Sequence, residues 1–444
     1  MSRGILTKAA GGFLALAVGL VPVGILPAVS AEEVPASLSL PEMLGELHRA
    51  NPELLSAKKQ AEAMRARIPQ ARGLPPPRIG VEFEEIPRGT FKVNQATVLY
   101  SLLQSIPFPG KLSLRQKVAM AEAQRSAALF KNTELDLTTQ LKAAYYDLFL
   151  ADRELEIQKE QKGWLDQALE SARIRYGTGG IPQAELLLSQ SEVLEAGNQL
   201  GVWSHRRRAL EARLNQLLNR PAQAPLGGPG EIPLQPVPDN PDSLVAQALE
   251  NQPELLVFRY SAERAEADWK LAKRELWPDL ETMVELRDPA MGPIGPWDLT
   301  LALVLPFWFW TKQRYGVRVA LFDKESAQAA FEGARNETAR KVYENWNEAK
   351  ASYDTAKLCQ ESLIPLASQA VAAGLASYQG GRSSFMELLE SLRMLAERKR
   401  TYYQHLAGLE QRMILLEQAV GLPLRAEHSV RTEHSAVYSK PVER

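Results

Sequence analysis

The sequence predicts a mainly α-helical protein with a small β part, in which a long antiparallel helical hairpin occurs twice. Three observations carry this prediction. The chain repeats itself at an offset of about 201 residues. Residues 112–162 contain no glycine or proline, and the helix of roughly 60 residues to which they belong would span about 90 Å. Four further segments alternate apolar and polar residues, the pattern of strands with two different faces.

The repeat is the feature that organises the chain. Asn51–Leu55 (NPELL) recurs as Gln252–Leu256 (QPELL), and Pro77 recurs as Pro278. The motif Y-x-x-G-x5-E-L-L starts at Tyr176 and again 202 residues later. A near-constant offset over so long a stretch indicates duplication. We therefore expect a first repeat over 38–221, a linker rich in proline and glycine over 222–241, a second repeat over 242–424 and a disordered polar tail over 425–444.

Each copy has the same order of predicted helices. An opening helix precedes two strands, a very long helix follows them, and a last helix returns after a glycine-rich break. The expected helices lie near 41–72, 112–174 and 184–218, and again near 243–275, 314–377 and 384–419. The returning helix is about half as long as its partner, so the opening helix stacked on its end would match the long one. Gly163 and Pro365 align just before the breaks, and we expect both long helices to bend there.

The four strands are expected at about 78–87, 97–107, 279–287 and 296–306. In three of the strands the apolar residues share one face, and the other face carries polar and acidic residues, whereas the strand at 97–107 alternates less regularly. Such strands suit a barrel with lipid outside and water inside. The residues expected to line that lumen are Glu82, Glu84, Asp279, Glu281, Glu285 and Asp298. A soluble four-stranded sheet packed on helices would also alternate. Four strands cannot close a lipid-facing barrel, so membrane insertion requires two or more chains.

Composition and the N-terminus narrow the functional classes. A net charge of −1 provides no field that would favour nucleic acid. Residues 1–31 read as a signal peptide, with Arg3 and Lys8 before an apolar run and small residues before the expected cleavage site. The alternative is an N-terminal membrane anchor. The only cysteine, Cys359, excludes an intrachain disulfide. The mature chain has no later apolar run of helical membrane-spanning length, so strands would have to enter a membrane.

This ordered set of features resembles the TolC-type outer membrane efflux proteins, the outer membrane factors of tripartite pumps. The resemblance covers about 38–424. It is carried by the duplicated helix–strand–strand–helix–helix plan, the NPEL helix starts, both tip motifs and Ser105–Lys111 (SIPFPGK). The PFPGK run is similar to that of members serving heavy-metal pumps, the CzcC and CusC type.

The resemblance implies a homotrimer in the outer membrane of a Gram-negative bacterium. Three chains would form a 12-stranded transmembrane β-barrel and a helical α-barrel that crosses the periplasm. The function would be a passive conduit that exports small solutes, with heavy-metal cations as one candidate cargo. Its partners would be a periplasmic adaptor (membrane fusion) protein and an inner-membrane transporter of the RND type, as well as outer membrane lipid.

The resemblance also gives roles to the two glycine turns, at 176–183 and 378–385. They would form the periplasmic tip on which the adaptor docks, at Tyr176, Gly179, Glu185, Tyr378 and Gly381. The second turn would carry the entrance and gate at Arg382, Glu387 and Glu390. The alternative for the glutamates is ordinary charge on a solvated helix. We expect the second turn to gate and the first mainly to dock.

No catalytic, metal-binding or cofactor-binding set is predicted. The five histidines are scattered, and none has a cysteine or a second histidine at ligand spacing. Neighbouring strand residues such as Glu84 and Glu85 point to opposite faces, which separates them as an acid–base pair. The alternative function is a periplasmic coiled-coil adaptor or interaction protein without a pore. Two hairpins, each preceded by paired strands, favour the conduit.

Overall fold

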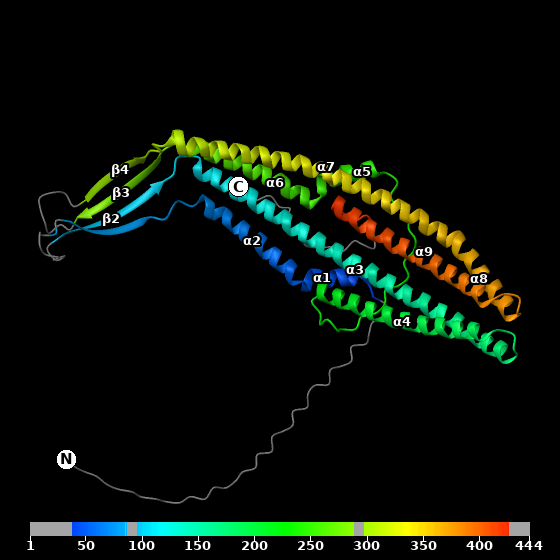
Figure 1. Cartoon of the computed structure of the whole chain (residues 1–444). Helices are drawn as coiled ribbons and strands as arrows, with labels where there is room; N and C mark the ends of the chain where they lie inside the picture. The colour runs from blue at the N-terminus through cyan, green and yellow to red at the C-terminus, as the bar shows by residue number, and fades with distance from the viewer. Residues whose placement is uncertain (1–37, 85, 87–95, 288–296, 426–444) are drawn as a thin grey trace, which may run out of the picture.

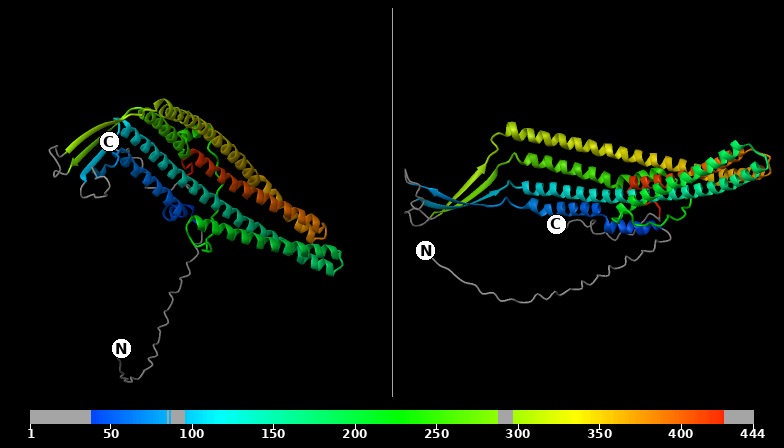
Figure 2. Two further views of the ribbon diagram at one scale, coloured as in Figure 1. Left: turned by 60° about the vertical axis from the view of Figure 1, so that its left-hand side comes forward. Right: turned by 60° about the horizontal axis from the view of Figure 1, so that its bottom comes forward.

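The computed structural model describes residues 38–84, 86, 96–287 and 297–425. The expected signal peptide lies outside this part of the chain, as do residues 426–444 of the expected tail and the outer ends of two expected strands. The described chain is a long rod with a β-sheet at one end and two helical hairpin tips at the other (Figures 1 and 2). The two copies of the repeat lie side by side along the rod.

Each copy contributes four or more helices and two strands. The first copy consists of α1 (Leu40–Ala50), α2 (Pro52–Arg72), β1 (Arg78–Glu84), β2 (Thr97–Ile106), α3 (Lys111–Gly177) and α4 (Gln183–Leu217). The second consists of α5 (Pro241–Asn251), α6 (Pro253–Arg274), β3 (Asp279–Arg287), β4 (Trp297–Val304), the π-helical turn η3 (Phe309–Gln313), α7 (Arg314–Leu358), the π-helical turn η4 (Cys359–Leu363), α8 (Ile364–Gln379) and α9 (Phe385–Val420). With 67 residues, α3 is about 100 Å long. None of the described helices combines the length and the apolar character needed to cross a bilayer.

The opening helix of each copy is two helices rather than the single one expected near 41–72 and 243–275. The chain leaves the helical region at Asn51 and at Gln252 because each precedes a proline. The Asn51 side chain then accepts hydrogen bonds from the backbone N–H groups of Glu53 (2.9 Å) and Leu54 (3.1 Å). Gln252 caps α6 in the same way. The NPEL sequence therefore starts the second helix of each pair.

The long helices of the two copies also differ from each other. In the second copy the π-helical turn η4 interrupts the helix just before Pro365, whose missing N–H cannot continue the α-helical pattern. In the first copy α3 runs unbroken through Gly163. The bend expected at both positions therefore has a structural counterpart only in the second copy, because glycine, unlike proline, retains its backbone donor.

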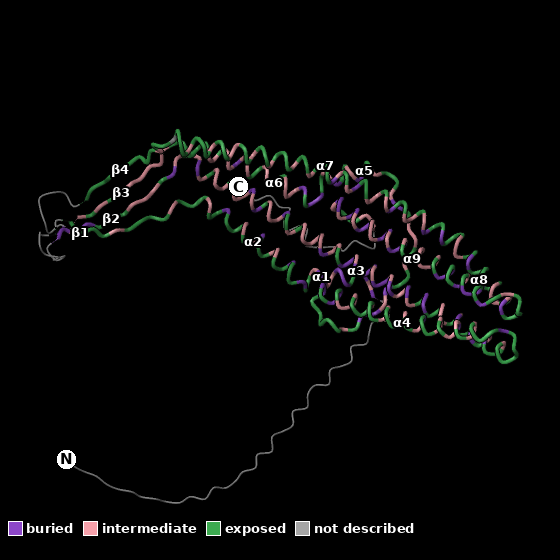
Figure 3. Tube along the Cα trace, viewed as in Figure 1, coloured by how far each residue is buried: buried purple, intermediate pink, exposed green. Residues whose placement is uncertain are grey.

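The sheet is antiparallel in the order β1-β2-β3-β4, so β2 and β3 join the two copies. Its register places apolar residues on one face, and they are largely exposed (Figure 3). The most exposed of them are Ile79, Tyr100, Leu286, Trp297, Leu299, Leu301 and Leu303. β1 and β4 form the two open edges.

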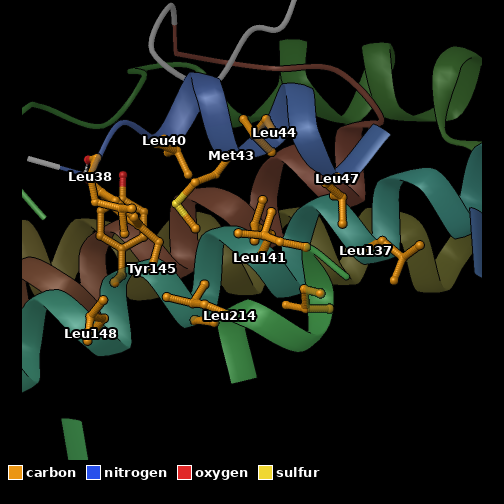
Figure 4. Packing of buried hydrophobic residues seen from close by; sticks show 14 of the residues in the cluster. Leu38, Leu40, Met43, Leu44, Leu47, Leu137, Leu141, Tyr145, Leu148 and Leu214 are labelled. Carbon is orange, nitrogen blue, oxygen red and sulfur yellow. Dashed lines mark hydrogen bonds between the residues drawn. The ribbon is translucent and has the colours of Figure 1, made fainter. Parts of the chain in front are cut away.

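The first copy has its main core where α1 packs across α3 and α4. Leu44 and Leu47 of α1 meet Leu141 and Leu148 of α3 and Leu214 of α4, and all five are at most 1% exposed (Figure 4). A second cluster fills the equivalent place in the second copy. A third lies near the tips and draws on both copies.

A buried ion pair joins the copies at mid-length. Lys142 Nζ of α3 lies 2.8 Å from Glu417 Oε2 of α9, and both side chains are at most 5% exposed. The other oxygen of Glu417 accepts the backbone N–H groups of Leu424 and Arg425. One carboxylate thus fixes the end of the second copy onto the long helix of the first.

We predict that Lys142→Met destabilises the protein strongly, because it leaves the Glu417 carboxylate buried without a cation. The expected cost is about 3–5 kcal/mol, measured as a lower midpoint of thermal unfolding of the helices by circular dichroism. Lys142→Met combined with Glu417→Gln should recover part of this loss. The matched control is Lys162→Met, which removes an exposed pair with Asp166 and should cost less than about 0.5 kcal/mol. Equal losses in both lysine variants would contradict the prediction.

Candidate gate at the hairpin tips

The two tips share one backbone design. The helix before each break ends in a left-handed glycine, Gly179 (φ +76°) or Gly381 (φ +71°). The next residue closes the helix in both: Gly180 N–H donates to Arg175 O (2.7 Å), and Arg382 N–H donates to Ser377 O (2.9 Å). Residues with a Cβ are strained at such φ values, which explains why both motifs carry glycine there.

The returning helices start differently. Ser384 caps α9: its hydroxyl accepts from Glu387 N–H (3.3 Å) and donates to Glu387 Oε1 (3.1 Å). This is one half of a capping box, because the Glu387 carboxylate accepts from the Ser384 hydroxyl and not from the Ser384 backbone N–H. In the first copy α4 starts after Pro182, which has no capping side chain. Glu387, predicted at the entrance, is therefore exposed but also part of the local structure of its turn.

A contact between the copies holds the two tips together. Tyr378, at the end of α8, is fully buried and packs 6.0 Å from the ring of Phe385. The guanidinium of Arg175, at the end of α3, lies 4.9 Å from the centre of the Tyr378 ring. Arg175 Nη1 also donates a hydrogen bond to the Tyr378 carbonyl (3.2 Å). The arginine of the first tip thus clamps the tyrosine of the second by a cation–π contact and a hydrogen bond.

Glu185 of α4 adds a negative charge beside this contact. Burial and, secondly, the charge of Glu185 raise the pKa of Tyr378 to about 12, against the opposing charge of Arg175. The phenol is therefore neutral at physiological pH. Within the described residues, Tyr378 Oη and Glu185 Oε1 are both buried without a hydrogen-bond partner.

A groove of about 950 Å³ runs between α4 and α9 over α3. Its charged and aromatic lining includes Glu192, Glu195, Trp203, Glu390, Arg393, Glu397 and Arg398. Arg393 Nη2 of the second copy reaches across to Glu192 Oε1 of the first at 2.9 Å. The predicted gate residue Glu390 therefore faces a charged groove between the two hairpins.

The predicted tip residues fall into two groups. Tyr176 is 43% exposed, and Arg382 and Glu390 are exposed as well. Tyr378, grouped with Tyr176 as a docking residue, is 0% exposed. The identical motifs hide this difference because, within one chain, only the second tyrosine packs against the other copy of the repeat. Tyr378 can act as a contact between tips but cannot touch a docked partner while the tips stay together.

At the sheet end, the register places all six predicted lumen residues on the polar face. They are Glu82, Glu84, Asp279, Glu281, Glu285 and Asp298, and Asp298 also lies 3.8 Å from Arg287. Asp279 differs from the others because it is engaged at the end of its strand. Its Oδ1 accepts hydrogen bonds from Lys111 Nζ (2.7 Å) and from Phe108 N–H (2.7 Å). Asp279 thus fixes the start of α3 to the start of β3.

The residues that sequence reasoning missed are those that join the copies. Arg175, Lys142 and Arg393 all contact partners about 200 or more residues away. Nothing in the local sequence distinguishes them from solvated helix charge. Lys111 is the last residue of the PFPGK run, but that motif does not indicate that its partner is the carboxylate of Asp279. In the part of the chain that the structure describes, no group of three or more histidine, cysteine, aspartate or glutamate side chains could hold a metal ion.

Comparison with known proteins decides the family. The model of the outer membrane efflux protein family matches residues 43–220 and, a second time, residues 244–422. The chain belongs to this family. Membership confirms the resemblance found in the sequence, the outer membrane location and the efflux function. The two matches also fall one on each copy of the repeat.

Individual relatives of the efflux family are distant but cover almost the whole chain. The cobalt-zinc-cadmium resistance protein CzcC of Cupriavidus metallidurans is 20% identical over 397 residues, 88% of this chain and 92% of that protein. The outer membrane protein VceC of Vibrio cholerae has a similar structure (TM-score 0.75, 15% identity, 87% of this chain and 97% of that one). So does CusC (TM-score 0.74, 14% identity, 87% and 92%). These likenesses confirm the fold class, long helical hairpins with strands for a barrel.

We predict that Arg175→Ala loosens the tips of this efflux protein, because it removes both contacts to Tyr378. Amide hydrogen exchange over residues 376–388 should accelerate about tenfold, which corresponds to roughly 1.4 kcal/mol of opening free energy. The control is Arg173→Ala, since Arg173 is exposed and pairs only along its own helix with Glu170. Exchange rates that are the same in both variants would show that Arg175 does not hold the tips.

Proposed function

We propose that this protein is the outer membrane channel of a tripartite efflux system, a passive conduit for small solutes. The observation that carries the proposal is the placement of the sheet and the paired tips at opposite ends of helices about 100 Å long. A membrane pore at one end and a docking site deep in the periplasm at the other require this separation. Efflux-family membership supports the same reading.

A homotrimer accounts for the open sheet. Four strands have two free edges, which lipid does not tolerate, whereas three chains supply twelve strands for a closed barrel. The exposed apolar face would then meet lipid, and the acidic face would line the water-filled lumen. The helices of three chains would continue as a tube through the periplasm.

The tips supply a gate in this scheme. Arg175 and Tyr378 hold the two hairpins of one chain together, while Glu387 and Glu390 place negative charge close by. A periplasmic adaptor would dock on the exposed tip surface around Tyr176 and Gly179 and shift the hairpins. The energy for transport would come from an inner-membrane transporter. No catalytic role is needed in such a conduit, and we propose none.

We propose metal cations as the cargo class. The acidic residues on the lumen face would raise the local concentration of cations without binding them tightly. CzcC, the relative named for cobalt, zinc and cadmium resistance, points the same way. In the competing function, a periplasmic adaptor without a pore, the apolar sheet face and both sheet edges would remain exposed to water.

We predict that the purified protein forms ion-conducting pores in planar lipid bilayers, and that Glu387→Ala with Glu390→Ala raises their conductance or lowers their preference for cations. Removing negative charge at a narrow entrance weakens the attraction for cations and widens the passage. The control is Asp166→Ala with Glu170→Ala, an equal loss of exposed charge on α3. Currents that do not change with the first pair would remove these glutamates from the entrance. A chain that is extracted as a soluble periplasmic monomer would contradict the channel itself.

A further inference from the structure

The two β-hairpins of the chain have the same register. When the partners of the first hairpin are shifted by 201 residues, they become the partners of the second: Arg78↔Leu103 becomes Asp279↔Val304. The same shift turns Glu84↔Thr97 into Glu285↔Asp298. The duplication is therefore kept residue by residue in the sheet, and one shift relates β1 to β3 and β2 to β4.

The pairing of β2 with β3, the seam that joins the two copies within a chain, provides a template for how the open edges of two chains would pair. β2 and β3 pair with Leu102 opposite Val284 and Gln104 opposite Thr282. Shifting β2 forward and β3 back by 201 residues gives a pairing of β4 with the β1 strand of a second chain. In this pairing Leu303 faces Phe83, and Leu305 faces Val81. All four side chains are exposed in the single chain.

The pairing obtained in this way preserves both faces of the sheet. Leu303 lies on the exposed apolar face with Leu299, and Phe83 lies on that face with Val81. The intervening pair, Val304 opposite Glu82, falls on the acidic face. A shift of one residue would place Glu82 among the apolar side chains. The register derived from the repeat is thus also one that keeps charge away from the apolar face.

The residues at the end of the sheet next to the helices differ between the seam within a chain and the proposed seam between chains. Inside the chain, Asp279 accepts hydrogen bonds from Lys111 and from the Phe108 N–H group, and Phe108 stacks on Trp277 with ring centres 5.0 Å apart. At the open edges the residue in the place of Asp279 is Arg78, of opposite charge. The opposing segment after β4 carries Phe307, Trp308 and Trp310, which are 69%, 68% and 50% exposed. In the derived register Val304, the last residue of β4, faces Glu82, so Arg78 lies four residues beyond the end of β4, beside this aromatic segment.

A closed ring pairs β4 of one chain with β1 of the next. We propose that the two strands pair in this register, and that Arg78 of the next chain packs against the aromatic residues Phe307, Trp308 and Trp310. The seam between subunits would then be closed by cation–π contacts where the seam within a chain is closed by an ion pair. The proposal rests on the proposed function for the closed ring, but it adds the register and the residues that join one subunit to the next.

Cysteine pairs test the register in the full-length protein in membranes. Leu303→Cys with Phe83→Cys should give disulfide-linked oligomers on oxidation, seen as a ladder on non-reducing gels. Opposite residues bring their Cα atoms within the roughly 4.4–6.8 Å that a disulfide needs. The matched control, Leu301→Cys with Phe83→Cys, is displaced by two residues along the same face and should link far less. Each single-cysteine variant controls for chance collisions, and buried Cys359 is kept throughout. Preferred linkage of the displaced pair, or no linkage in either, would overturn the register.

Substitution of Arg78 tests the charge. Arg78→Met keeps the length of the side chain but loses its cation, and should increase the dissociated fraction about two- to fivefold at the temperature where the wild-type oligomer begins to fall apart in detergent. Arg78→Lys should restore most of the loss. Lys273→Met is the control, because Lys273 lies 3.3 Å from the ring centre of Trp269 on its own helix, away from the sheet edges. Unchanged dissociation in Arg78→Met would overturn the aromatic joint.

Pore measurements separate this inference from the proposed function. If the chain conducts ions in bilayers but the predicted cysteine pair does not link, the register fails and the channel stands. If no pores and no oligomers form, both the register and the proposed function fail.

Discussion

The packing of the first copy against the second is the interaction on which the rest of the structure depends. α3 lies against α6 near the sheet and against α9 further down, and the buried pair of Lys142 and Glu417 fixes the helices at mid-length. A second buried carboxylate nearby, Glu410, is bound by Arg425 and by the Tyr146 hydroxyl. Buried charges are costly unless fully paired. Sliding one copy along the other would separate these pairs, so the pairs favour a single alignment of the copies. That alignment places the tips together at one end and β2 against β3 at the other.

Duplication also makes the two copies unequal. Each copy offers the same two sides, but within the chain the first uses one side and the second uses the other. The remaining side of each copy, which ends at β1 in the first and at β4 in the second, has no neighbouring copy in a single chain. Equivalent positions therefore differ in residue or in environment: Asp279 where β2 meets β3 corresponds to Arg78 at the edge, and buried Tyr378 corresponds to exposed Tyr176. Sequence symmetry therefore predicts where such positions lie but not what they do.

The sequence was sufficient for the elements and insufficient for their contacts. Periodicity and the repeat located all four strands and both tips because those signals are local or recur at a constant offset. The break before Pro52 was missed although its cause is local: NPEL was named as a helix start, but one continuous helix was expected over 41–72. Gly163 was expected to bend α3, but it keeps its N–H and leaves the helix continuous. The burial of Tyr378 and the engagement of Asp279 depend on partners about 200 residues away, which no local pattern encodes.

The same comparison of copies bears on how the proposed gate is built. Near the tips the hairpins of one chain are held together by a hydrogen bond and a cation–π contact from Arg175 to Tyr378 and by the ion pair of Arg393 with Glu192. At an offset of 202 the counterparts of Arg175, Glu192 and Arg393 are Ser377, Met394 and Ser191, none of which carries a charge. In a ring of chains, contacts that contain this ion pair and cation–π contact would therefore alternate with contacts that lack them. The tips would separate where the contacts between them are weaker, which is between subunits. The two hairpins of one chain would then move together, and the passage would widen between subunits. On this argument the arginine that ends α3 matters because its counterpart in the second copy is a serine.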